Sequence, residues 1–216
     1  MAELQSLIRA ERLALIEFLE TLEPAEWETR SLCGAWTVQA VAAHLAWASA
    51  TPVTETLVSL ARSGFRLNQA SAEMAVRWAC RGPAVILDQL RANAANGAKP
   101  VGVPMDAVLV DAVVHALDIR LPLGRPRPVP AEAFRIVADF SMTAKWPMTI
   151  SVGGSARKRL DGLRLVADGY DWSSGDGQDV HASGEAVLRL LNGRPVERDE
   201  LTGPGADQLY ARVNRR

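Results

Sequence analysis

The chain has 216 residues, of which 48% are hydrophobic and 23% are charged, so it can bury a sizeable core. Its 24 basic and 25 acidic residues give a net charge of -1 and form no basic block, which argues against nucleic acid or an anionic membrane as the partner. The two cysteines, Cys33 and Cys80, lie in no CxxC pattern and predict neither a disulfide framework nor a zinc knuckle. A small-molecule partner fits this composition best.

The first predicted element is an amphipathic helix over residues 2–22, which Pro24 ends. Its apolar residues recur on one helix face, at Leu4, Leu7, Ile8, Leu15, Phe18, Leu19 and Leu22. Glu11 falls on the same face, either as a partner of a metal ligand or as a carboxylate at the edge of the apolar stripe. Acidic residues recur throughout this segment, so it resembles neither a signal peptide nor a membrane span, and we expect a cytoplasmic protein.

A second helix is expected to begin at Val38, because the Thr37 hydroxyl can accept a backbone N–H at the helix start. This helix carries His44 among alanines, which leave room beside the imidazole. Pro52 interrupts it, since proline removes a helical hydrogen bond, and a new helix is expected near Thr54.

Helices are expected next over residues 68–80, 83–96 and 105–120. Asn68 is a suitable N-cap for the first of them. Pro83 suits the first turn of the second helix, and Gly97 suits its end. After a proline-rich turn, another helix is predicted over residues 131–145.

Short segments typical of strands replace the helices after Pro147. They are residues 149–152, 163–166 and 179–182, and glycine-rich turns separate them. Two helices follow, over residues 185–191 and 206–213. The chain is therefore expected to be an α+β protein, with a helical bundle over residues 1–146 and a small α+β module over residues 147–216.

The helix expected over residues 105–120 is apolar almost all round, yet it carries Asp111 and His115. At this spacing the two side chains share one helix face, with their Cβ atoms about 5–6 Å apart. A buried polar group without a partner costs about 1–3 kcal/mol, so both groups need partners. They can bond to each other, or join His44 in a two-histidine, one-carboxylate set that holds zinc or another divalent ion with a position left open. The spacing alone leaves both interpretations open.

Three other residues each have a functional and a structural interpretation. Asp118 can orient the imidazole of His115, or it can form a salt bridge or a hydrogen bond at the helix end. Cys33 lies in a turn near the candidate site, as a reactive thiol or as a buried structural cysteine. His181 lies in an expected strand beside Asp179 and is interpreted as a surface residue.

Two stretches of the sequence resemble a known family. The run CGAWTVQAVAAHL (33–45), followed by VDAVVHALDIRLPLG (110–124), resembles the N-terminal domain of the mycothiol-dependent maleylpyruvate isomerase family, a branch of the DinB-like metal-binding four-helix bundles. The run DGYDWSSGDGQDVHASGEAVLRLLNGRP (168–195) resembles the family's C-terminal α+β domain, which is similar to sterol-carrier proteins. The resemblance covers both domains in the expected order.

The resemblance implies that His44, Asp111 and His115 ligate a divalent metal, zinc or alternatively nickel, and that mycothiol is the thiol cofactor. Such a metal lowers the pKa of a bound thiol, so that the thiolate nucleophile exists at neutral pH. Neither cysteine of the chain is well placed to supply that thiol. An isomerase would add the thiolate to an activated double bond, allow rotation and then eliminate it. A transferase would stop after addition or displacement.

The leading hypothesis is therefore a metal- and mycothiol-dependent enzyme that acts on a small electrophile, as an isomerase or S-transferase and as a monomer or homodimer. Two other classes stay open. A non-catalytic binding protein would enclose an apolar ligand, with its histidines bonded to protein atoms and too far apart to share an ion. An adaptor module is disfavoured by the balanced charge and by the lack of an obvious apolar stripe for a partner.

Overall fold

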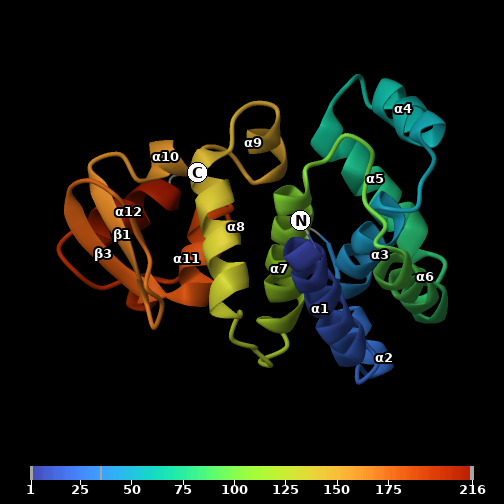
Figure 1. Ribbon diagram of the computed structural model, residues 1–216, viewed down its shortest axis with the longest axis horizontal. Coiled ribbons are helices and arrows are strands. Elements are labelled where there is room, and N and C mark those ends of the chain that lie inside the picture. The colour runs from blue at the N-terminus through green and yellow to red at the C-terminus, as the bar shows by residue number, and fades with distance from the viewer. Residues whose placement is uncertain (1, 35, 215–216) are drawn as a thin grey trace. The chain divides into compact units, whose positions relative to one another are not determined.

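The computed structural model describes residues 2–34 and 36–214 and divides the chain into two compact units, Met1–Pro126 and Arg127–Arg216 (Figure 1). The first unit contains α1 (Ala2–Leu19), α2 (Pro24–Trp27), α3 (Val38–Ala48), α4 (Val53–Arg62), α5 (Leu67–Ala79), α6 (Pro83–Asn96) and α7 (Met105–Arg120). The second contains α8 (Ala131–Thr143), α9 (Met148–Ser151), α10 (Ala156–Arg159), β1 (Leu163–Asp168), β2 (Ser173–Gly175), β3 (Gln178–Ser183), α11 (Gly184–Leu191), the 3-10 helix η1 (Arg198–Glu200) and α12 (Ala206–Val213). Within the part of the chain that the structure describes, no helix is both long and apolar enough to cross a bilayer.

A four-helix bundle forms the core of the first unit. Both α1 and α3 pack against α6 and α7, so the four helices close a ring, and α5 packs against α3 (Figure 1). Ala42, Ala43 and Ala46 of α3 are completely buried at this contact. Their small side chains let neighbouring helices approach α3 closely, so a functional side chain on α3 can reach groups on α7.

The helix ends follow the local sequence signals in most places. The Thr37 hydroxyl accepts a hydrogen bond from the Ala40 N–H at 3.3 Å, as expected for the cap of α3. Helices α6 and α7 have their predicted bounds, and α6 ends at Gly97 with a left-handed φ of 59°, which glycine adopts without strain.

Other predicted helix ends differ from the structure. Arg66 stands at the N-cap of α5, two residues before the predicted cap Asn68, which lies inside the first turn. Helix α1 ends at Leu19, three residues before the predicted end. Pro24, whose fixed φ suits a first helical turn, begins the short helix α2.

Asn93 of α6 joins α6 to the end of α3. Its side-chain Nδ2 donates to the carbonyl oxygens of Ala46 at 2.8 Å and Leu45 at 3.4 Å, and its Oδ1 accepts from Gln89. The last-turn carbonyls of a helix lack partners within the helix, so this buried amide satisfies groups that would otherwise be lost. Asn93 therefore fixes the end of the helix that carries His44.

A three-stranded sheet with the strand order β2-β1-β3 organises the second unit. The central strand β1 pairs antiparallel with β2 and parallel with β3. Leu163, Leu165 and Ala167 alternate along β1 as buried residues. Helix α11 packs on β1 and β3 and also contacts α8, and α12 packs on β3. The fold is thus α+β, with a helical bundle and a smaller α+β unit, as the sequence predicted.

Two strand predictions are wrong. Residues 149–152 were expected to form a strand, but they lie in α9 and its C-cap, because no strand of the β2-β1-β3 ladder extends alongside this segment to pair with it. Conversely, β2 occupies the polar, glycine-rich stretch that reads as a turn. Pairing with β1 overrides the weak strand propensity of this short segment.

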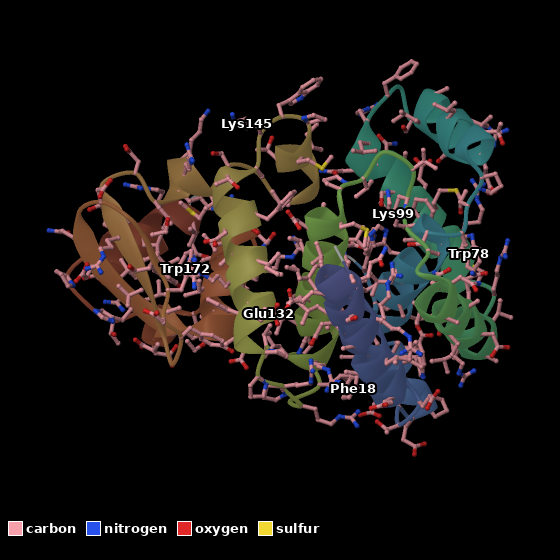
Figure 2. The ribbon with its side chains drawn as sticks, viewed as in Figure 1. Phe18, Trp78, Lys99, Glu132, Lys145 and Trp172 are labelled. Atoms are coloured by element: carbon pink, nitrogen blue, oxygen red, sulfur yellow. The ribbon has the colours of Figure 1, made fainter. Side chains whose placement is uncertain are left out.

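Helix α8 belongs to the second unit, so the division between the units falls before α8 and not near Pro147. The Tyr170 ring stacks on Phe134 of α8 with centroids 4.0 Å apart, and its hydroxyl donates to the Val129 carbonyl at 2.7 Å. Trp172, labelled in Figure 2, lies between the sheet and α8 and donates from Nε1 to Asp139 at 2.9 Å. These contacts attach α8 to the sheet. The periodicity of a helix does not reveal which unit it packs against, because these contacts join residues far apart in the sequence.

Replacing Asn93 with alanine tests its structural role. We expect Asn93→Ala to lower the free energy of unfolding by about 1–3 kcal/mol, because it leaves buried carbonyl oxygens at the end of α3 without donors. The matched control is Asn96→Ala, at an exposed position of the same helix, which we expect to be neutral or slightly stabilising. Urea unfolding of both variants measures the difference, and equal stabilities would contradict the assignment.

Candidate metal centre

Helices α3 and α7 bring together the three residues that the resemblance implied as metal ligands. The Nε2 atom of His44 lies 3.3 Å from Oδ1 of Asp111, and the Nε2 atom of His115 lies 3.4 Å from the same oxygen. The two imidazole rings are 4.9 Å apart at their centroids and nearly perpendicular, at 75°. Two histidines from different helices therefore converge on one carboxylate oxygen.

These side chains fit a divalent ion. One ligand atom from each of His44, Asp111 and His115 lies within 4.8 Å of the others. Ligands bound at about 2.0–2.1 Å to a tetrahedral zinc ion are about 3.3–3.4 Å from one another. The nitrogen-to-oxygen separations of 3.3 and 3.4 Å match that requirement. Two imidazoles and a carboxylate leave at least one position open, as catalytic zinc sites do.

The second nitrogen of each histidine also has a partner. Nδ1 of His115 lies 2.9 Å from Oδ2 of Asp118, whose side chain is completely buried. Nδ1 of His44 lies 3.3 Å from the Ser71 hydroxyl of α5. When these nitrogens donate their protons to the two oxygens, each neutral imidazole presents the lone pair of Nε2 to the metal position. Asp118 therefore occupies the orienting position that its spacing from His115 indicated.

A second group of potential ligands overlaps the first. Cys33, His115 and Asp118 also offer ligand atoms within 4.8 Å of one another. In this group the Asp118 carboxylate already bonds to Nδ1 of His115, and Nε2 of His115 faces Asp111. The geometry therefore favours the group that contains His44 as the metal site. Cys33 lies beside the hydrogen-bonded pair of His115 and Asp118.

Two tryptophans flank the histidines. The Trp36 ring lies 5.3 Å from the His44 ring and 6.3 Å from the His115 ring, measured between centroids. Trp47 meets the His44 ring edge-on at 5.7 Å. These rings limit the access of water to the imidazoles, while the Asp111 side chain keeps 38% of its surface exposed. The candidate centre is therefore open to solvent on the side of Asp111.

The pKa values of Asp111 and His115 are both strongly shifted in the metal-free protein. Burial alone would lower the pKa of His115, but hydrogen bonds to Asp111 and Asp118 outweigh it and raise this pKa to about 9. Burial alone would raise the pKa of Asp111, but attraction to His44 and hydrogen bonds from His115 and His44 hold it well below its usual range. A proton thus occupies the position between His115 and Asp111 where a metal ion would bind.

Other residues singled out in the sequence lie elsewhere or take other roles. Glu11 is buried on α1, but neither ligand group found among residues 2–34 and 36–214 contains it. His181 lies on β3, is partly exposed and pairs with Asp168 at 3.3 Å. Ser71 and Arg12, which lines a pocket with Asp111, have no sequence signal because only tertiary packing brings them to the site.

Comparison with known families gives a match in the N-terminal part of the chain. Residues 8–99 match the mycothiol maleylpyruvate isomerase N-terminal domain. This region contains His44 and Ser71, whereas Asp111 and His115 lie beyond it. The match confirms the family resemblance that the motifs indicated. No curated protein matches the chain in sequence.

Solved structures extend the likeness to both units. Crystal structures of the mycothiol-dependent maleylpyruvate isomerase and of a histidine-to-alanine variant of it each match with a TM-score of 0.61 and 17% sequence identity. Each match covers 95% of this chain and 93% of the other. At this identity the likeness establishes a shared fold.

The raised pKa of His115 predicts how the stability of the metal-free protein changes with pH. A raised folded-state pKa contributes stability that is complete below the unfolded value of 6.5 and is lost as the pH rises through about 9. We therefore expect the free energy of unfolding to fall across this interval. Urea unfolding of chelator-treated protein measures it.

Two variants separate this effect from other titrations. His115→Gln should flatten the pH dependence between 6.5 and 9, whereas His181→Gln, at a partly exposed histidine of the second unit, should leave it unchanged. An unchanged slope in His115→Gln would contradict the assigned pKa.

The orienting role of Asp118 predicts an effect on metal affinity. We expect Asp118→Asn to weaken zinc binding by about 10–100-fold, because the bond that fixes the His115 ring loses its charge. Ser71→Ala should cause a smaller loss, since a neutral hydroxyl holds His44 at 3.3 Å. Competition with a chromophoric chelator measures both affinities. Asp106→Asn, at an exposed position of α7, is the control, and wild-type affinity in Asp118→Asn would exclude the orienting role.

Proposed function

We propose that the chain is a metal- and mycothiol-dependent enzyme that isomerises a small electrophile carrying an activated double bond. The observation that carries the proposal is the convergence of His44 and His115 on Oδ1 of Asp111 at 3.3 and 3.4 Å. The match of residues 8–99 to the mycothiol maleylpyruvate isomerase N-terminal domain supports the choice of thiol and reaction class. Zinc is the proposed ion, with nickel as the alternative.

The proposed roles of the chain's residues follow from their contacts. His44, Asp111 and His115 would hold the ion. A bound ion would lower the pKa of a bound thiol, so that a thiolate able to add reversibly to a double bond would exist at neutral pH. Asp118 fixes the tautomer of His115 through the 2.9 Å contact at Nδ1, which keeps Nε2 available. Trp36 lies beside both histidine rings and keeps water from that side.

The geometry weighs against a non-catalytic binding protein. That alternative requires a large apolar cavity and histidines too far apart to share an ion. The ligand atoms lie within 4.8 Å of one another, and the cavity beside Asp111 has a volume of only about 20 Å³. A larger pocket of about 570 Å³ lies in the second unit, but charged residues such as Asp139, Arg157 and Asp176 line it, so it is not an apolar cavity. S-transfer, by contrast, needs the same ligands as isomerisation, so the reaction products must distinguish these two reactions.

The proposal predicts a metal content that depends on particular histidines. After supplementation with zinc or nickel, the protein should hold one ion per chain, and His44→Ala and His115→Ala should each lose it. His181→Ala, which changes a histidine of the second unit, should keep it. Elemental analysis of the purified proteins measures the content. An unsubstituted protein that stays metal-free after supplementation would overturn the proposal.

The reaction is tested with metal-loaded protein, mycothiol and a panel of cis-configured electrophiles that includes maleylpyruvate. The expected result is cis-to-trans conversion that requires the thiol but does not consume it, because the carbon–sulfur bond that forms on addition breaks again on elimination. If a stable adduct between thiol and electrophile accumulates instead, the protein is an S-transferase and not an isomerase. No reaction with any electrophile by a fully metal-loaded protein would contradict an enzymatic role.

A further inference from the structure

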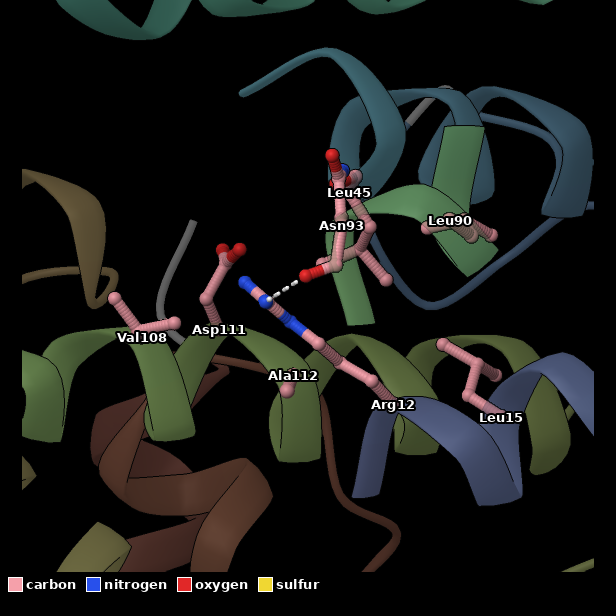
Figure 3. A pocket seen from close by; sticks show the side chains of 8 residues that line it. All are labelled: Arg12, Leu15, Leu45, Leu90, Asn93, Val108, Asp111 and Ala112. Atoms are coloured by element: carbon pink, nitrogen blue, oxygen red, sulfur yellow. Dashed lines mark hydrogen bonds between the residues drawn. The ribbon is translucent and has the colours of Figure 1, made fainter. Parts of the chain in front are cut away.

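A cation from another helix shares a pocket with the proposed metal ligand Asp111. Arg12 extends from α1 toward the Asp111 carboxylate of α7 (Figure 3). The pocket that both residues line has a volume of about 20 Å³. Its remaining lining residues are mostly apolar, and they are Leu15, Leu45, Leu90, Asn93, Val108 and Ala112. A positive charge on an apolar-walled pocket beside a metal ligand has a stronger field than it would have in water.

The surrounding helices hold the Arg12 guanidinium in place. Nη1 donates to the backbone carbonyl of Asn93 at 3.2 Å (Figure 3), and Nη2 donates to the Ser49 hydroxyl at 3.4 Å. Asn93 is itself buried and bonded to the end of α3. These contacts involve two of the five N–H donors of a guanidinium. The side chain is therefore positioned, with donor capacity beyond these two bonds.

Arg12 and Asp111 attract each other without direct contact. Among the described residues, no ion pair within 4.0 Å joins Arg12 to Asp111, and Oδ1 of Asp111 instead faces the two histidines. Burial lowers the pKa of Arg12, and the charge of Asp111 opposes this shift. Arginine nevertheless stays protonated in proteins. When Asp111 binds a metal ion, the ion neutralises the charge of the carboxylate. Arg12 is then a fixed cation that faces the pocket without a neutralising partner in direct contact.

We propose that Arg12 binds a carboxylate of the substrate in the pocket beside Asp111 and thereby selects anionic electrophiles over neutral ones. This inference rests on the proposed function, because it assumes that Asp111 ligates an ion. A guanidinium matches a carboxylate geometrically, since its planar N–H fork can donate to both oxygens. Arg12 is the specificity-determining residue in this assignment, and Asn93 and Ser49 position it.

The size of the pocket limits what enters it. A volume of about 20 Å³ admits only one or two water-sized groups, so it receives the end of a molecule and not the whole of it. A carboxylate meets this limit, with the rest of the electrophile outside the pocket and near the metal position. A divalent ion brings one more positive charge to the site than the His115 proton that it replaces, so anion binding should be stronger when the ion is bound.

The experiment compares a dicarboxylate with its neutral analogue in the absence of thiol, so that binding occurs without reaction. Zinc-loaded and zinc-free proteins are titrated with maleate and with maleamide by calorimetry, and the zinc content of every sample is measured. Arg12→Met removes the charge and retains the length of the side chain. Arg9→Met, at an exposed position of the same helix, removes an equal charge away from the pocket.

We expect Arg12→Met to bind zinc normally and to lose about ten-fold or more in maleate affinity, the typical worth of a hydrogen bond to a charged group. Its affinity for maleamide should not change. Arg9→Met should bind both compounds as the unsubstituted protein does. Removal of zinc should weaken the binding of maleate but not the binding of maleamide. If Arg12→Met does not fold, as judged by circular dichroism, Arg12→Gln carries the same expectation.

Two results would overturn the inference and leave the proposed function intact. They are unchanged maleate affinity in zinc-loaded Arg12→Met, and equal losses for maleate and maleamide, which would mean that Arg12 only supports packing. Absence of zinc from the supplemented, unsubstituted protein would instead overturn the proposed function, and this inference with it.

Discussion

The candidate site depends on one atom, Oδ1 of Asp111, on which the Nε2 atoms of His44 and His115 converge. In the metal-free protein this convergence is stabilised by a proton, and the pKa of His115 rises to about 9 as a result. A divalent ion would occupy the same position, so proton and ion compete for one set of ligand atoms. The contacts of Asp118 and Ser71 with the far nitrogens keep the rings aimed at this position in both cases. The bundle therefore presents a preorganised set of ligands.

Local signals predicted most of the fold, because helix ends depend on nearby residues. The cap at Thr37 and the left-handed Gly97 follow from side-chain chemistry within one turn of the helix. The errors have a non-local cause. Strand β2 exists because β1 pairs with it, and residues 149–152 form no strand because no partner lies beside them. Helix α8 joins the second unit through the ring and hydrogen-bond contacts of Tyr170 and Trp172, which no periodicity reveals.

The sequence predicted the candidate metal ligands better than the residues that support them. Helical spacing placed Asp111 and His115 on one face, but it did not distinguish a bonded pair from metal ligands. His44, about seventy residues earlier in the chain, was a candidate third ligand by residue type, and the family resemblance favoured metal ligation for all three residues. The structure brings the Nε2 atom of His44 to 3.3 Å from Asp111. The contacts of Arg12 and Ser71 join helices that are adjacent only in the folded bundle, so no local sequence pattern indicates either residue. The supporting residues of a site are thus harder to predict than its ligands.

X-ray absorption at the zinc edge tests the central claim most directly, because two groups of ligands share His115 and only one contains sulfur. If His44, Asp111 and His115 hold the ion, the zinc-loaded protein should show only nitrogen and oxygen in its first shell. A sulfur neighbour at about 2.3 Å should then appear on addition of mycothiol. A sulfur neighbour present before any thiol is added, which would come from Cys33, would contradict the account. So would a first shell that stays free of sulfur when mycothiol is present.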